Sequence, residues 1–148
     1  MRRLLGMLRD GDAPSRAPQP GLTSLDELVA GVRDAGLAVS VEITGAPSAI
    51  SPGIDLSAYR VVQEGLTNAL RHSAAGQARV EIRYRTGSLE LQVLDAGPGA
   101  VRRDDRGDGG RGLAGMRERV ALYGGTLERG PDGGGWRLRA LLPLEEPA

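Results

Sequence analysis

Residues 78–84 (ARVEIRY) and 89–95 (LELQVLD) alternate between apolar and polar side chains, and only the four residues RTGS separate them. Alternation with a period of two is the pattern of a strand with one buried face. A connection this short favours an antiparallel hairpin. Because a hairpin cannot bury its own apolar face, we expect a sheet that is covered on one side by helices.

The rest of the chain supplies the covering helices and further strands. Helices are predicted at 23–36, at about 54–75 and at 113–124, and further strands at 37–43, 125–130 and 135–143. In the first helix, Thr23 or Ser24 is the expected cap and Gly36 the expected stop. The order of elements predicts an α/β two-layer sandwich, in which a mixed, largely antiparallel sheet carries its helices on one face.

The domain organisation follows from composition along the chain. Residues 1–9 (MRRLLGMLR) form a short amphipathic fragment, and residues 10–21 are rich in proline and glycine, as in a linker. The globular domain is expected at 22–144, and residues 145–148 form a tail. A chain of 148 residues suits one such domain with a sizeable core.

The composition excludes several functional classes. The 19 basic and 19 acidic residues balance, which argues against a general nucleic-acid binder. The chain has no cysteine and no lysine, so it has no thiolate metal site, no P-loop and no lysine Schiff base. No apolar run is long enough to span a bilayer, and the N-terminus lacks a signal-peptide pattern. We therefore expect a cytoplasmic domain without direct membrane contact.

Polar side chains recur every four residues along the second predicted helix, at Glu64, Asn68 and His72. The predicted core stripe of this helix comprises Tyr59, Val62, Leu66, Ala69 and Leu70. The polar edge lies roughly 150° from the centre of that stripe. It is therefore either a solvated face or, if another segment covers it, a site at which Glu64 and Asn68 offer oxygen ligands to Mg²⁺.

Two glycine-rich motifs follow. DAGPG (95–99) comes directly after a strand, so Asp95 can accept a hydrogen bond while the glycines let a flat ligand approach the backbone. GGRGLAGM (109–116) leads into a helix, where backbone N–H groups can bind an anion. Each motif is also compatible with an ordinary turn. The second is not a dinucleotide fingerprint, because no parallel βαβ unit surrounds it.

The order of these motifs resembles the GHKL (Bergerat) ATP-binding fold of histidine kinases, gyrase, Hsp90 and MutL. EGLTNALRHS resembles the N box, DAGPG the first glycine box and GRGLAGMRERV the second. With YRVVQE upstream and LYGGTLERGPDGGGWRLRALLP downstream, they most closely resemble sensor kinases of the nitrate-sensor and DesK type, which partner LuxR-type response regulators. The resemblance covers about 22–144.

The resemblance implies a role for each motif in binding ATP and Mg²⁺. Asp95 would accept a hydrogen bond from the exocyclic amine of adenine, and Gly97 and Gly99 would let the ring approach the backbone. Asn68 would hold Mg²⁺. Glu64 would orient a Mg²⁺-bound water or act as the base that helps to activate the attacking histidine.

The same resemblance assigns the phosphate contacts. Arg71 and His72 would contact the phosphates from the end of the helix. The motif that contains Gly110, Gly112 and Leu113 would bind the nucleotide and, with the loop 101–109, form a lid over the phosphates. That lid would be the cover that the polar edge requires.

The expected activity is transfer of the ATP γ-phosphoryl to a histidine. The sequence departs from the wider kinase pattern because it has no phenylalanine-containing box and because its single histidine, His72, belongs to the N box. The fragment MRRLLGMLR resembles the end of a dimerisation helix, so the acceptor histidine is expected on a dimerisation domain upstream. The chain would then be an excised, truncated or orphan catalytic domain. The alternatives are an anti-sigma-type serine kinase and a non-catalytic nucleotide-binding interaction module.

Overall fold

The computed structural model describes residues 19–47, 49–73, 76–95, 108–132 and 135–144, with the backbone alone for 108–112 and 132. In chain order, the elements are η1 (Leu22–Ser24), α2 (Leu25–Asp34), β1 (Ala38–Thr44), α3 (Pro52–His72), β2 (Gln77–Arg85), β3 (Ser88–Asp95), α4 (Asp108–Leu122), β4 (Thr126–Asp132) and β5 (Gly135–Pro143). No helix within these ranges combines the length and the hydropathy needed to cross a bilayer.

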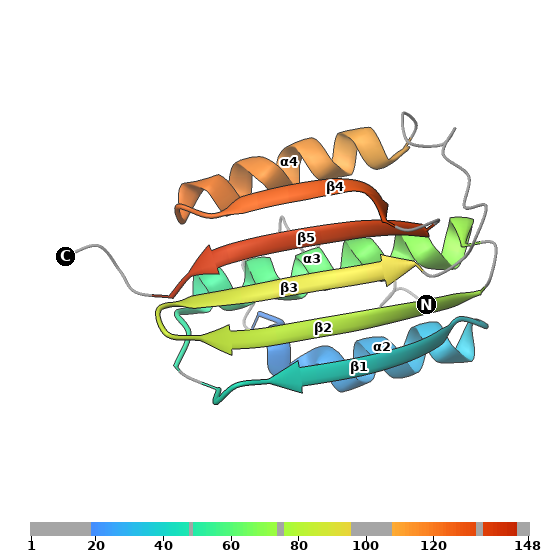
Figure 1. Cartoon of the computed structure of the whole chain (residues 1–148), viewed down its shortest axis with the longest axis horizontal. Helices are drawn as coiled ribbons and strands as arrows, with labels where there is room; N and C mark the ends of the chain where they lie inside the picture. Colours follow the sequence, from blue (N-terminus) through green and yellow to red (C-terminus); the bar gives the residue numbers. More distant parts are fainter. Residues whose placement is uncertain (1–18, 48, 74–75, 96–107, 133–134, 145–148) are drawn as a thin grey trace.

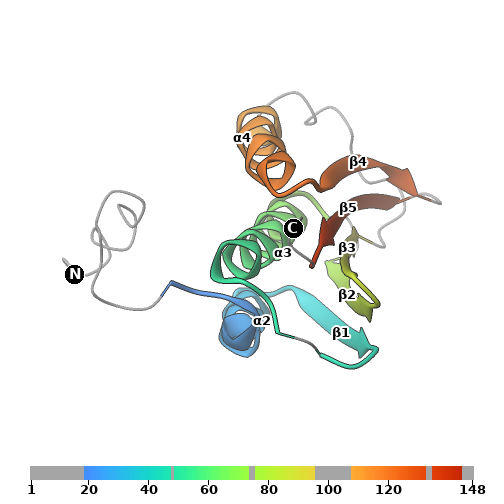
Figure 2. The same ribbon diagram turned by 90° about the vertical axis from the view of Figure 1, so that its left-hand side faces the viewer.

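The strands form a five-stranded sheet in the order β1-β2-β3-β5-β4. Strand β1 pairs parallel to β2, and every other neighbouring pair is antiparallel. Helices α2, α3 and α4 lie side by side on one face of the sheet (Figures 1 and 2). The structure therefore confirms the two-layer α/β sandwich with a mixed, largely antiparallel sheet.

The hydrophobic core lies between the sheet and the helix layer, with α3 in the middle of that layer (Figure 2). At Gly65 this helix comes unusually close to β3. A Cβ atom built on Gly65 would lie 2.7 Å from both Cβ and Cγ2 of Val93, closer than side chains normally pack. The absence of a side chain at Gly65 therefore lets α3 pack directly against the middle of β3.

The boundaries of several helices differ from the prediction. Helix α3 begins at Pro52, whose fixed φ suits the first helical turn, and it ends at His72 rather than near residue 75. Helix α4 begins at Asp108, five residues before the predicted start at 113. Ser24 occupies the cap position of α2, but its side chain makes no capping hydrogen bond. Gly36 ends that helix as predicted, with φ of +111°.

The predicted core stripe of α3 was partly wrong. Tyr59 is only half-buried, and 38% of Leu70 is exposed. The buried residues of the helix are instead Ile54, Ser57, Ala58, Val61, Val62, Gly65, Leu66, Asn68 and Ala69. The buried face is therefore rotated toward Asn68, because small side chains allow the helix to turn that side to the sheet. The polar edge borders the core instead of lying opposite to it.

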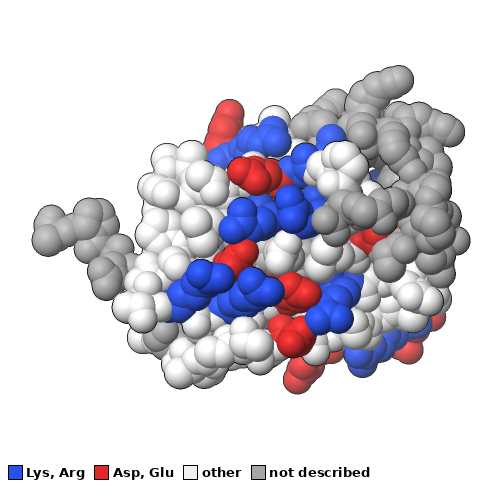
Figure 3. All heavy atoms as spheres, viewed as in Figure 1, with Lys and Arg blue, Asp and Glu red and all other residues white. Residues whose placement is uncertain are grey.

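The other face of the sheet is open and carries a network of arginine and glutamate side chains (Figure 3). On this face Arg79 pairs with Glu42 and Glu81. Glu90 lies farther along the sheet and is only 5% exposed. It accepts a hydrogen bond of 2.8 Å from Nε of Arg139 and pairs with Arg85 at 3.2 Å. The buried carboxylate is therefore compensated by neighbouring guanidinium groups.

Replacing Glu90 by glutamine is expected to lower the free energy of unfolding at neutral pH by about 1.5–3 kcal/mol, because the neutral amide lacks the charge that attracts the guanidinium groups around it. Burial alone would raise the pKa of Glu90, but Arg139, Arg85 and Arg83 outweigh it and hold that pKa below its ordinary value. The stabilisation from Glu90 is therefore present above the unfolded-state pKa and is lost as the pH falls through the lower folded-state pKa.

Urea unfolding at a series of pH values measures this effect. Stability of the original chain should fall on acidification more steeply than that of Glu90→Gln, so the two curves should converge in acid. Parallel curves would show that the charge of Glu90 does not contribute.

Candidate nucleotide-binding site

Three segments that are distant in sequence meet at one end of the molecule. The C-terminal end of α3, the end of β3 and the first turn of α4 all lie at this end (Figure 1). Helix α3 contacts both β3 and α4. The fold therefore brings the polar edge of α3, Asp95 and the glycine-containing start of α4 to the same end of the domain.

Asp95 is the last residue of β3 and is only 5% exposed. The strand pairing places it between Ala78 of β2 and Trp136 of β5, so its backbone belongs to the interior of the sheet. Side chains alternate along a strand, so Asp95 lies on the same face as the buried Leu91 and Val93. Its carboxylate therefore lies on the helix side of the sheet, at the edge of the core.

Ser73 contacts this carboxylate directly. Its Oγ donates a hydrogen bond of 2.8 Å to Oδ1 of Asp95 and accepts one of 3.0 Å from the backbone N–H of Gly76. Ser73 is the last residue of the N-box motif EGLTNALRHS, but the sequence indicated no role for it. Nothing in the sequence links positions 73 and 95, and the contact exists only because α3 ends beside the end of β3.

The polar edge of α3 is mostly sheltered from solvent. Asn68 is only 8% exposed, Glu64 and His72 are half-buried, and Arg71 is exposed. Glu64 and Asn68 lie one helical turn apart on the same side of the helix, so their side chains are neighbours. The structure thus places the predicted residues together and rules out a fully solvated face for Asn68.

The available oxygens fit a magnesium ion that is shared with a nucleotide. Among the described residues, no cluster of three histidine, aspartate or glutamate side chains could hold a metal without other ligands. Mg²⁺ usually takes one or two protein oxygens and completes its shell with phosphates and water. The amide oxygen of the nearly buried Asn68, with Glu64 one turn away, is a donor set of that kind.

The described residues include only part of the two glycine boxes. Gly97, Gly99 and the lid residues 101–107 lie outside the described residues. The backbone of Gly110 and Gly112 forms part of the first turns of α4, rather than the loop before it. Leu113 is 2% exposed and belongs to the hydrophobic core, so its visible role is to pack α4 onto the domain.

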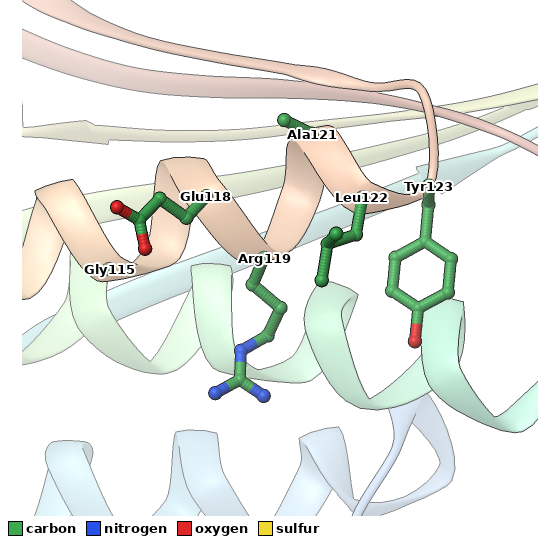
Figure 4. A pocket seen from close by; sticks show the side chains of 6 residues that line it. All are labelled: Gly115, Glu118, Arg119, Ala121, Leu122 and Tyr123. Atoms are coloured by element: carbon green, nitrogen blue, oxygen red, sulfur yellow. The ribbon is translucent and has the colours of Figure 1, made fainter.

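A separate hollow lies along α4 (Figure 4). It is lined by Gly115, Glu118, Arg119, Ala121, Leu122 and Tyr123. Leu122 is 81% exposed, and both it and Tyr123 lie at the end of α4 far from its first turn. Neither Asp95 nor the polar edge of α3 contributes to this hollow. The predicted site residues Asp95, Asn68 and Glu64 therefore lie outside this hollow.

Comparison with known families identifies the class of this domain. The family described as "Histidine kinase-, DNA gyrase B-, and HSP90-like ATPase" matches residues 53–146, which include the polar edge of α3, Asp95 and α4. The chain belongs to this family. Within it, the similarity to curated proteins identifies the chain as an ATP-binding catalytic domain of the sensor histidine kinase type.

The relatives are sensor histidine kinases. The sensor histidine kinase LiaS of Bacillus subtilis is 32% identical over 146 residues, which cover 97% of this chain and 39% of LiaS. The oxygen sensor histidine kinase NreB of Staphylococcus carnosus is 39% identical over 74 residues, covering 50% of this chain and 21% of NreB. This chain therefore spans less than half the length of these relatives.

Solved structures share the fold. The histidine kinase AdeS of Acinetobacter baumannii superimposes with a TM-score of 0.65 at 19% identity, over 98% of this chain and 76% of the AdeS chain. The catalytic domain of the histidine kinase ThkA gives a TM-score of 0.62 at 14% identity, over 82% of this chain and 92% of that domain. At these identities the superpositions establish the architecture alone.

Proposed function

We propose that this domain binds Mg·ATP at the end of the helix layer and transfers the γ-phosphoryl to a histidine of a dimerisation domain. The observation that carries the proposal is the buried carboxylate of Asp95, which lies on the helix side of the sheet at the same end of the domain as Asn68. A buried carboxylate at the end of a strand can accept a hydrogen bond from the exocyclic amine of adenine. The polar edge of α3 supplies ligands for the phosphate end of the nucleotide.

Different residues of the chain bind the adenine base, hold Mg²⁺ and assist phosphoryl transfer. Asp95 accepts from the exocyclic amine of adenine, and Gly97 and Gly99 allow the ring to lie against the backbone. Asn68 holds Mg²⁺, which supplies charge neutralisation at the phosphates. Glu64 orients a water or serves as the base for the attacking imidazole.

The remaining contacts concern the phosphates. Arg71 and His72 bind them from the end of α3, since their positions follow Asn68 on the same helix. Gly110 lies in the first turn of α4 and Gly112 directly after that turn. The free N–H groups of the first turn would favour the negative charge of the phosphates. Phosphoryl transfer needs mainly positioning and charge compensation, which such an arrangement would provide.

The partners follow from the motif resemblance. EGLTNALRHS, DAGPG and GRGLAGMRERV resemble the nitrate-sensor and DesK type of kinase, so we assign the chain to that group. The acceptor histidine would lie on a dimerisation domain that precedes the catalytic domain. The phosphoryl group would then pass to a response regulator of the LuxR type. The proposed location of the domain is the cytoplasm.

Nucleotide selectivity tests the proposed site. The original chain should bind ATP and ADP in preference to GTP, because guanine carries a carbonyl where adenine carries the amine. Asp95→Asn should weaken ATP binding by about 1–3 kcal/mol, or about 5- to 150-fold, and narrow the preference for ATP over GTP. Isothermal titration calorimetry of both nucleotides with both proteins measures the difference.

Glu81→Gln is a matched control, because Glu81 is an acidic residue of the open sheet face and pairs with Arg79. It should leave both nucleotide affinities unchanged. Equal affinity of the original chain for ATP and GTP would refute the assignment of Asp95 to adenine.

A further inference from the structure

We infer that Ser73 is a positioning residue that holds the carboxylate of Asp95 in the orientation required to distinguish adenine from a 6-oxopurine. The inference rests on the proposed role of Asp95 and extends it to Ser73, the last residue of the N box, to which the motif resemblance assigns no role. Ser73 donates a hydrogen bond to the carboxylate, so we infer that its effect on nucleotide selectivity is exerted through Asp95.

The direction of the hydrogen bonds at Ser73 is fixed by the chemistry of its partners. The backbone N–H of Gly76 can only donate, and it lies 3.0 Å from Oγ of Ser73. An ionised carboxylate can only accept, and Oδ1 of Asp95 lies 2.8 Å from the same oxygen. The hydroxyl proton of Ser73 therefore points at Asp95. A bond between a hydroxyl and a charged acceptor is stronger than one between neutral groups.

The fold also fixes the position of Ser73. Its backbone N–H donates to the carbonyl of Ala69 at 2.9 Å, so Ser73 is still attached to the last turn of α3. Gly76 has φ of +68°, and its carbonyl accepts a hydrogen bond of 3.0 Å from the N–H of Ala38 at the start of β1. These hydrogen bonds hold Ser73 between α3 and the edge of the sheet. Its hydrogen bond to Asp95 in turn holds the carboxylate in place.

A fixed carboxylate has a specific consequence for selectivity. Each carboxylate oxygen can accept more than one hydrogen bond, so the bond from Ser73 is compatible with a second bond from an adenine amine. A carboxylate that could rotate would align less well with the amine of an aminopurine. It could also turn away from the carbonyl of an oxopurine. Restricting this rotation therefore raises the affinity for an aminopurine and preserves the rejection of an oxopurine.

The test compares ATP with inosine triphosphate (ITP), which carries a carbonyl at the position of the adenine amine. Calorimetric titrations use the full chain and the variants Ser73→Ala, Ser73→Thr and Ser73→Val. Ser73→Ala and Ser73→Val should weaken ATP binding about tenfold and should not weaken ITP binding. Ser73→Thr should retain the affinity for ATP. Threonine and valine have nearly the same shape, so their difference isolates the hydroxyl, and thermal unfolding verifies that each variant is folded.

A double-mutant cycle separates this inference from the proposed site. In the Asp95→Asn background, Ser73→Ala should cause no further loss of ATP affinity, because both changes remove the same interaction. An equal loss of ATP and ITP, equal behaviour of the threonine and valine variants, or no loss of ATP affinity would overturn the role of Ser73. If Asp95→Asn by itself leaves the ratio of ATP to ITP affinity unchanged, the adenine site is wrong, and the inference about Ser73 is overturned with it.

Discussion

Glu64→Gln is expected to slow phosphoryl transfer by about 10²–10⁴-fold while leaving the affinity for Mg·ATP nearly unchanged. Glutamine keeps the size of the side chain but removes the carboxylate that we propose as the base, or as the group that orients a bound water. Transfer is measured by mixing this chain with γ-labelled ATP and a separate dimerisation domain from a related sensor kinase. Label on that domain reports transfer, and calorimetry reports affinity.

Asn68→Ala provides the contrast, because Asn68 is the proposed ligand of Mg²⁺ one helical turn away. This variant should lose the Mg²⁺ dependence of ATP binding, so that binding and transfer fall together. If Glu64→Gln transferred phosphoryl groups as fast as the original chain, its catalytic role would be wrong. If Asn68→Ala bound Mg·ATP normally, the metal site on α3 would be wrong.

Gly65→Ala is expected to lower the free energy of unfolding by about 1–3 kcal/mol, although alanine is the better helix former. The reason is steric, because the added methyl group would lie 2.7 Å from Val93, in the buried contact between α3 and β3. Relief requires α3 to move away from the sheet, which would also shift Asn68 relative to Asp95. Urea unfolding measures the stability, and ATP titration measures the effect on the site.

Gly31→Ala is the matched control, because Gly31 also lies in a helix, α2, where an added Cβ would meet no atom within 4 Å. This substitution should stabilise the protein by about 0.5–1 kcal/mol, as expected when alanine replaces glycine in a helix. If Gly65→Ala stabilised the chain as Gly31→Ala does, the close packing of α3 on β3 would be contradicted.

The sequence predicted the architecture well because local patterns determine it. The alternation of residues 78–84 and 89–95 identified β2 and β3, and the short connection implied their antiparallel pairing. The spacing of Glu64, Asn68 and His72 identified one edge of α3. Gly36 ended α2 as expected, with a backbone conformation that glycine adopts easily. Each of these features depends on residues that are neighbours along the chain.

The sequence could not determine which face of α3 would be buried. Tyr59 and Leu70 fit an apolar stripe, yet the helix turns Ala58, Gly65 and Asn68 toward the interior. Hydrophobic periodicity ranks side chains by polarity, whereas burial also depends on how closely the opposing surface can approach. Here the lack of a side chain at Gly65 allows contact with Val93, and that contact sets the rotation of the helix.

By itself, the sequence determined the order of the elements, the two-layer class and the three ordered motifs of the ATPase family, because these arise from short-range periodicity and spacing. Only the tertiary structure decided that β5 lies between β3 and β4, that Asn68 is nearly buried, and that Ser73 meets Asp95. The physical reason is that Ser73 and Asp95 belong to different elements, whose ends come together only after the helix layer has packed onto the sheet.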